Sequence, residues 1–130
     1  MTIEEFQDAL SSDNPTPGGG TASAIALGHA ASLVAMVASL TIGNEKWSEG
    51  WGVSKSAIIL ANSVIKDSAK LATEDSDAFE DVMNSFKLPK NTDDEKNIRR
   101  EAIRNSTLKA AQIPYRTAPV SYTHLTLPTM

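Results

Sequence analysis

The fold of this chain is decided by one uncharged stretch, residues 21–42, which reads TASAIALGHAASLVAMVASLTI. It contains no Asp, Glu, Lys or Arg, and its Ala, Ser, Thr and Gly residues outnumber its large apolar ones. A helix without a charged face is typical of a position inside a protein core. The stretch therefore predicts the central helix of a bundle, with Gly43 as its C-cap.

The same stretch has a second interpretation, because it is just long enough to cross a bilayer. Its composition argues against that interpretation. Small residues dominate, and the flanking cationic and aromatic anchors expected of a membrane span are weak. We therefore expect a bundle helix and no membrane partner.

The residues before this stretch predict one short helix. Thr2 and Glu5 have the spacing of a capping box. Ile3, Phe6 and Leu10 then give the helix a single apolar face. The segment SSDNPTPGGG follows, and its two prolines prevent the helix from continuing.

The residues after it predict a loop and two further helices. NEKWSEGWG is a polar and aromatic loop, and a long helix is expected over residues 53–86, ended by Pro89. Thr92 and Glu95 form a second capping box, which opens a last helix that runs to about Gln112 and is closed by Pro114. We find no β alternation and no internal repeat. The fold class predicted is an all-α antiparallel helical bundle, incomplete at the C-terminus.

Length, charge and composition exclude several classes of function. The 130 residues correspond to one domain, and the net charge of -4 with scattered Lys and Arg makes nucleic acid an unexpected partner. The absence of cysteine excludes thiolate catalysis and Cys-type zinc sites. His29 and His124 are the two histidines, and no spacing resembles a metal site. The acidic, polar start has no targeting signal, so a cytoplasmic location is expected.

The last residues are set apart from the domain. VSYTHLTLPT, at 120–129, is β-prone and uncharged, and it resembles the translation of a transposon sequencing adapter. We expect residues 1–119 to be the domain and residues 120–130 to be a cloning or assembly scar, the alternative being a genuine C-terminal strand. Tyr122 and His124 are therefore left out of the candidate site.

Three glycines stand directly before the uncharged stretch, at Gly18, Gly19 and Gly20. Backbone N–H groups at a helix N-terminus lack partners and carry partial positive charge. Glycine lets a ligand's carbonyl, carboxylate or phosphate approach those groups, and it also permits unusual φ values. The loop is thus a candidate ligand cradle. The alternative is that the glycines only let the helix start against a crowded neighbour.

Asp75 is the second unusual feature, because it falls within the expected buried stripe of the third helix. Apolar residues mark that stripe at helical spacing, namely Val64, Leu71, Phe79, Val82 and Phe86. A carboxylate there must be paired, hydrogen-bonded or protonated. Burial raises the pKa of a carboxyl group toward the range useful for general acid–base catalysis, although a purely structural aspartate is the commoner outcome. Three neighbouring acids are expected to be solvated, namely Asp77, Glu80 and Asp81, and His29 is expected to be a core histidine.

Three segments together resemble the cyclodeaminase/cyclohydrolase family. They are PTPGGGTASA, DSDAFEDVMNSFKLPKNTDDEKNIRREAI and AAQIP, and the likeness extends over about residues 6–118. Members of this family continue into further helices, where this chain has the adapter-like tail. The chain therefore resembles a truncated member.

The resemblance implies an all-α homodimer that binds a reduced folate. It implies that Asp75, in a D-x-x-x-F pattern, is the catalytic residue. It also implies that the substrate is bound by Gly18, Gly19, Gly20 and Lys46. No catalytic role is transferred to His29. The substrate implied is a tetrahydrofolate derivative, with no metal and no other cofactor.

The reaction implied is one of two. Either formiminotetrahydrofolate is converted to 5,10-methenyltetrahydrofolate and ammonia, or 5,10-methenyltetrahydrofolate is hydrolysed to 10-formyltetrahydrofolate. Two other functions stay open at this point: a non-catalytic helical interaction module, and an inactive fragment of an enzyme.

Overall fold

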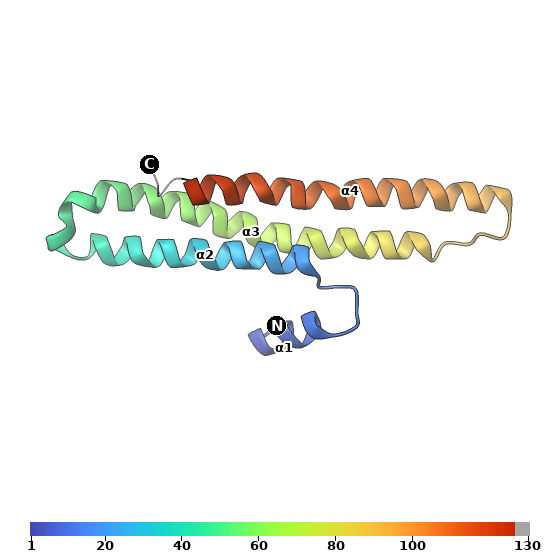
Figure 1. The fold of residues 1–130 in the computed structure, drawn as a ribbon, viewed down its shortest axis with the longest axis horizontal. Coiled ribbons are helices and arrows are strands. Elements are labelled where there is room, and N and C mark those ends of the chain that lie inside the picture. The colour runs from blue at the N-terminus through green and yellow to red at the C-terminus, as the bar shows by residue number, and fades with distance from the viewer. Residues whose placement is uncertain (127–130) are drawn as a thin grey trace.

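The computed structural model describes residues 1–126, and this part of the chain is helical with no strand. The elements are α1 (Ile3–Ser11), α2 (Gly19–Ile42), the 3-10 helix η1 (Glu45–Gly50), α3 (Trp51–Phe86) and α4 (Asp93–Thr126). Figure 1 shows α2, α3 and α4 as long rods, with α3 antiparallel to both α2 and α4. The all-α bundle prediction is confirmed, whereas its C-terminal incompleteness stays a prediction.

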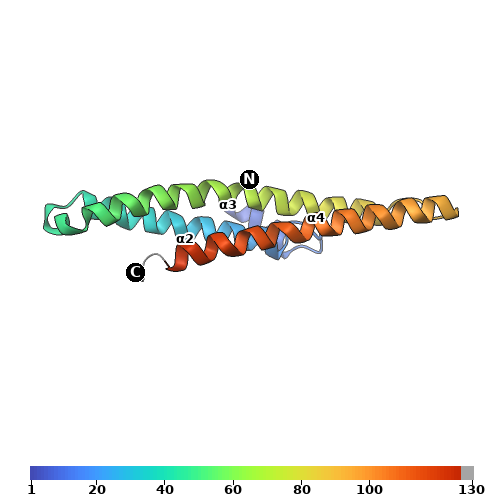
Figure 2. The ribbon, with the colours of Figure 1, turned by 90° about the horizontal axis from the view of Figure 1, so that it is seen from above.

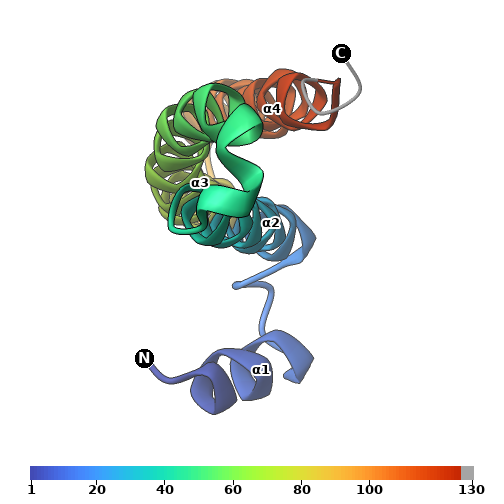
Figure 3. The same ribbon diagram turned by 90° about the vertical axis from the view of Figure 1, so that its left-hand side faces the viewer.

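The helix shared by the bundle is α3, not α2 as expected. α3 packs against both α2 and α4, which touch each other little (Figure 2). Viewed along the rods, the three helices form an open arc and α1 lies apart from it (Figure 3). α2 therefore buries one face only, and large apolar side chains on its other face are about half exposed or more, namely Leu33, Met36, Val37 and Leu40.

The exposed face of α2 bears on the membrane question. By length and composition alone, α2 is the one helix within residues 1–126 that could cross a bilayer. A core helix of a soluble protein passes the same test, so a single helix of this kind is weak evidence.

Both predicted capping boxes are present. The Glu5 N–H donates to Thr2 Oγ1 at 3.1 Å, and the Thr2 N–H donates to Glu5 Oε2 at 2.6 Å. The Glu95 N–H donates to Thr92 Oγ1 at 3.1 Å, and the Thr92 N–H donates back to Glu95 Oε2 at 3.2 Å. Each box satisfies N–H groups that a helix start leaves without intrahelical acceptors.

The core between α2 and α3 is built from small residues. Its two clusters consist of Ala24, Leu71, Ala72, Ala78 and Ile113, and of Leu27, Ala31, Ala61 and Val64. Gly28 is buried within this contact, and a Cβ placed on it would overlap Ser68 Oγ. The two helix backbones therefore approach closely where α2 has no side chain.

The buried face of α3 differs from the stripe expected. Val64 and Leu71 are buried as predicted, but Phe79 is 42% exposed and Phe86 is 51% exposed. The packed face instead passes through small residues, including Ala78 and Ser85. Asp77, Glu80 and Asp81 are exposed, as predicted.

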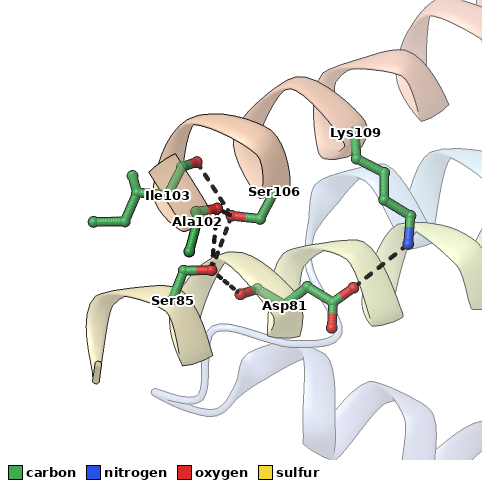
Figure 4. Close-up of polar contacts among 6 residues, drawn as sticks. All are labelled: Asp81, Ser85, Ala102, Ile103, Ser106 and Lys109. Atoms are coloured by element: carbon green, nitrogen blue, oxygen red, sulfur yellow. Dashed lines mark hydrogen bonds and ion pairs between the residues drawn. The ribbon is translucent and has the colours of Figure 1, made fainter. Parts of the chain in front are cut away.

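Polar groups join α3 to α4 near the turn between them (Figure 4). Ser85 Oγ and Ser106 Oγ are 3.1 Å apart, and the Ser85 hydroxyl also donates to the Asp81 carbonyl at 2.9 Å. Lys109 Nζ lies 3.6 Å from Asp81 Oδ2 at the surface. A serine pair fills this narrow interface, where larger apolar side chains would force the helices apart.

Two predictions are corrected by the helices themselves. α4 does not end before Pro114 but continues to Thr126, with two prolines inside it. Tertiary contacts on both sides of Pro114 hold the helix together, since Ile113 is buried in the core and Arg116 pairs with Glu74 across to α3.

His29 is exposed and not a core histidine, because it lies on the face of α2 that α3 does not cover.

The structure describes only part of the segment that we predict to be an adapter scar, residues 120–130. The backbone of residues 120–126 continues α4, so no strand forms there, and residues 127–130 lie outside the described residues. The assignment of residues 120–130 to an adapter scar stays a prediction.

The close packing at Gly28 predicts the effect of adding a methyl group. Gly28→Ala should lower the free energy of unfolding by about 1–3 kcal/mol, the usual cost of overpacking. Ser68→Ala in the same chain should recover most of the loss, because it removes the overlapping oxygen. Urea unfolding measures both effects.

Gly52→Ala is the matched control for that experiment. A Cβ at Gly52 meets no atom within 4 Å, so alanine there should leave stability unchanged or raise it by up to about 1 kcal/mol. Equal effects at Gly28 and Gly52 would contradict the close contact between α2 and α3.

Candidate functional site

The glycine triplet forms the start of α2. Gly18 is the N-cap residue and makes no side-chain cap hydrogen bond, while Gly19 and Gly20 are the first two helical residues. The Ala22 N–H donates to the Gly18 carbonyl at 3.0 Å. The N–H groups of Gly19, Gly20 and Thr21 precede this bond, so they point out of the helix start and bring partial positive charge to it.

The three glycines do not serve a special backbone conformation. Within residues 1–126 no glycine has a positive φ, which corrects that part of the expectation. Their surroundings differ instead. A Cβ on Gly20 would overlap the carboxylate of Asp75, whereas a Cβ on Gly19 would meet no described atom within 4 Å. Crowding therefore explains Gly20, and it leaves Gly19 as an open approach to the backbone.

Asp75 lies on α3 directly against the first turn of α2. It is half-buried, and its Oδ2 is 3.1 Å from Oγ1 of Thr21, a residue that is only 5% exposed. The positive end of the α2 dipole favours a negative group at this place. The structure thus brings together Asp75 and the glycine turn, which lie about 55 positions apart in the sequence.

A second hydroxyl completes the group. Ser76 Oγ is 2.8 Å from Thr21 Oγ1, and the Ala72 carbonyl oxygen is 3.4 Å from the same atom. Sequence reasoning did not select Thr21 or Ser76. Neither residue stands out by type or spacing, because both contacts depend on how α2 and α3 are placed against each other.

The acidic side chains near Asp75 on α3 make their ion pairs and hydrogen bonds with residues other than Asp75. Glu74 pairs with Arg116 at 2.6 Å and with Lys70 at 3.8 Å, and Glu80 accepts a hydrogen bond from the Thr16 hydroxyl at 3.2 Å. None of the ion pairs found within residues 1–126 includes Asp75. Its carboxylate is therefore held by a hydroxyl group without a cation beside it.

Lys46 does not join this site within one chain. It is exposed on η1, which follows the C-terminal end of α2, whereas the glycines form the N-terminal end. An α-helix rises about 1.5 Å per residue, so roughly 35 Å separates the two ends of α2. The substrate-binding role of Lys46 stays a prediction that this geometry does not support.

Two further features concern ligands. Among the described residues, no three His, Cys, Asp or Glu side chains are grouped so that they could hold a metal ion. An apolar groove lies between the other ends of α2 and α3, and it is lined mainly by Leu33, Val34, Val37, Val53 and Leu60. This groove contains neither Asp75 nor the glycines and offers no titratable group for catalysis.

The contact between Gly20 and Asp75 predicts a selective response to alanine. Gly20→Ala should lower the melting temperature by roughly 3–8 °C relative to Gly19→Ala, because only the former displaces a carboxylate. Combining Gly20→Ala with Asp75→Ala should recover most of the difference. A thermal melt followed by circular dichroism checks this, and indistinguishable melts for the two single variants would refute the contact.

Comparison with known proteins places this chain in a family. Residues 2–129 match a family model described as Formiminotransferase-cyclodeaminase. The chain is 40% identical over 113 residues to a methenyltetrahydrofolate cyclohydrolase of Methylorubrum extorquens, an alignment that covers 87% of this chain and 54% of the relative.

Two vertebrate relatives match at lower identity. A formimidoyltransferase-cyclodeaminase of Gallus gallus is 27% identical over 109 residues, or 84% of this chain and 20% of that protein. Its counterpart in Rattus norvegicus is 25% identical over 117 residues, or 90% of this chain and 22% of that protein. The chain spans about half the length of the bacterial relative and about a fifth of the vertebrate ones. Since the family model covers nearly all of its residues, the chain belongs to the formiminotransferase-cyclodeaminase family.

Proposed function

We propose that this chain acts in folate one-carbon metabolism, with Asp75 as the acid–base group and the first turn of α2 as part of the substrate site. One observation carries the proposal. Asp75 is a half-buried carboxylate without a cation partner among the described residues, and it lies against a helix start whose N–H groups are free of intrahelical bonds. A proton-transfer group and hydrogen-bond donors thus occupy one place.

The reaction that we favour is hydrolysis of 5,10-methenyltetrahydrofolate to 10-formyltetrahydrofolate. The relative with 40% identity bears the name of this activity, whereas the two named for the cyclodeaminase are 25% and 27% identical. In this reaction water adds to the cationic methenyl carbon and the ring opens. Asp75 would accept the proton of the attacking water, and its negative charge would offset the charge of the substrate.

The cyclodeaminase reaction is the second candidate, and the same carboxylate suits it. Folate N10 attacks the formimino carbon carried on N5, ammonia leaves, and the methenyl bridge closes. A carboxyl group would take the proton from the attacking nitrogen and deliver it to the leaving one. Since both reactions require one proton-shuttling group at the same carbon, the site geometry suits either.

The glycine turn would bind polar edges of the folate. The N–H groups at the start of α2 are donors with no intrahelical acceptor, and Gly19 leaves the approach to them open. Gly18 and Gly20 would contribute in the same way, with the space beside Gly20 already filled by Asp75. A reduced folate is the substrate in this proposal, and the acid–base step needs no metal.

The proposal also includes a homodimer located in the cytoplasm. The support for association is the apolar surface of α2, where Leu33, Val37 and Leu40 are all more than half exposed. Burial of such a surface against a partner favours association by about 25 cal/mol per Å² of apolar area. Leu33 and Val37 also line the apolar groove between α2 and α3, whose apolar character suits an interface better than a catalytic site.

Replacement of Asp75 by Asn tests the assignment. Asn keeps the shape of the side chain but cannot take up a proton, and general acid–base groups contribute about 100- to 10,000-fold to turnover. We expect Asp75→Asn to lower kcat for methenyltetrahydrofolate hydrolysis at least about 100-fold. The loss of methenyl absorbance with time measures the rate.

Asp77→Asn is the control, because Asp77 is an exposed acid two positions further along α3. Its turnover should match that of the unaltered chain. Near-normal turnover in the Asp75 variant would remove the catalytic assignment. If the unaltered chain shows neither turnover nor tetrahydrofolate binding by calorimetry, the chain is an interaction module or an inactive fragment instead.

A further inference from the structure

We propose that Thr21 is a positioning residue for Asp75: its hydroxyl holds Oδ2 of the carboxylate and thereby fixes where the acid–base group lies. This inference rests on the proposed function of Asp75. It concerns a residue outside the glycine triplet, which follows Gly20 in the first turn of α2.

The direction of the hydrogen bond follows from the chemistry of the two groups. An ionised carboxylate only accepts hydrogen bonds, so the contact of 3.1 Å between Thr21 Oγ1 and Asp75 Oδ2 is donated by Thr21. Thr21 has a single hydroxyl proton. The Ala72 carbonyl is farther from the Thr21 hydroxyl, at 3.4 Å, and is neutral, so it is the weaker acceptor of the two.

Ser76 supports this direction. Its Oγ is 2.8 Å from Thr21 Oγ1, and either oxygen can act as the donor. When Ser76 donates to Thr21, the Thr21 proton is available to Asp75. The result is a short chain of donors that runs from Ser76 through Thr21 to the carboxylate, and each bond in such a chain polarises the next.

The carboxylate needs a partner of this kind to be fixed. An aspartate side chain can turn between staggered χ1 rotamers, and its terminal torsion is broad, so packing alone does not set the position of its two oxygens. Thr21 is the hydrogen-bond donor found for Asp75 within the described chain. Gly20 lies beside the whole carboxylate, nearest to Oδ1, and provides the space that the carboxylate fills.

Thr21 is suited to hold the carboxylate precisely. It is 5% exposed, so water does not compete freely for its hydroxyl. Its branched Cβ restricts rotation about χ1, which limits the directions in which the hydroxyl can lie. Removal of that hydroxyl leaves one carboxylate oxygen against a methyl group. Rotation of Asp75 toward solvent then lowers the free energy, because water can donate a hydrogen bond to that oxygen.

The test compares Thr21→Val, which has the same shape without the hydroxyl, with Thr21→Ser, which keeps it. Three-bond couplings measured by NMR report whether the Asp75 side chain occupies one χ1 rotamer. We expect a single rotamer in the unaltered chain and in Thr21→Ser, and an averaged one in Thr21→Val. Ser76→Ala should keep the single rotamer, because Thr21 can donate without it.

Steady-state kinetics give the second measurement. Thr21→Val should lower kcat by roughly tenfold, as expected for a misplaced reacting group, with less than about a twofold change in KM. Thr21→Ser should restore kcat to within about threefold of the unaltered value. Should the valine variant fail to fold by circular dichroism, Thr21→Ala takes its place, because it adds no bulk and also lacks the hydroxyl.

Two results would overturn the proposal. One is a single Asp75 rotamer in the variant that lacks the hydroxyl, and the other is equal averaging in Thr21→Val and Thr21→Ser. Failure of the proposed function looks different. In that case Asp75→Asn retains turnover, while the couplings still report whether Thr21 holds the carboxylate.

Discussion

The contact between the first turn of α2 and Asp75 on α3 is the constraint on which the candidate site depends. Gly20 has no side chain, and the Asp75 carboxylate occupies the place where a Cβ would be. The contact exists because the two helices approach closely along a face of Ala, Gly and Ser, continued by Gly28 against Ser68. Small residues thus set the distance between the helices, and that distance sets the position of the acid group.

The helix start and the carboxylate have complementary electrostatic properties. The start of α2 supplies N–H donors and partial positive charge, and Asp75 supplies a negative charge that is not cancelled by a salt bridge among the described residues. In the proposed function, a substrate with a cationic carbon and polar edges would meet both kinds of group at one place. The apolar groove and Lys46 lie toward the other end of α2, away from Asp75 and the glycine turn.

The fold was predictable where local chemistry decides it. Each capping box is recognised from two residues three positions apart, and Gly43 ends α2 as expected. Errors arose where tertiary contacts override local preference. Pro114 should stop a helix, yet packing of Ile113 and the pairing of Arg116 with Glu74 carry α4 past it.

The candidate site was partly predictable for the same reason. Asp75 is conspicuous as a carboxylate at an otherwise apolar position, and three adjacent glycines are conspicuous by composition. The role of Thr21 was not predictable, because a threonine in a helix rich in small residues carries no signal until the partner helix is placed. The prediction that Phe79 is buried was wrong, because periodicity locates a face of the helix without showing how closely the neighbouring helix approaches that face.

The most direct measurement of the central claim is a crystal structure of this chain with a bound 5,10-methenyltetrahydrofolate or 10-formyltetrahydrofolate. The account predicts that the one-carbon unit lies within hydrogen-bond reach of Asp75, with polar edges of the folate on the N–H groups that start α2. A folate bound instead in the apolar groove, or beside Lys46 with Asp75 untouched, would contradict it.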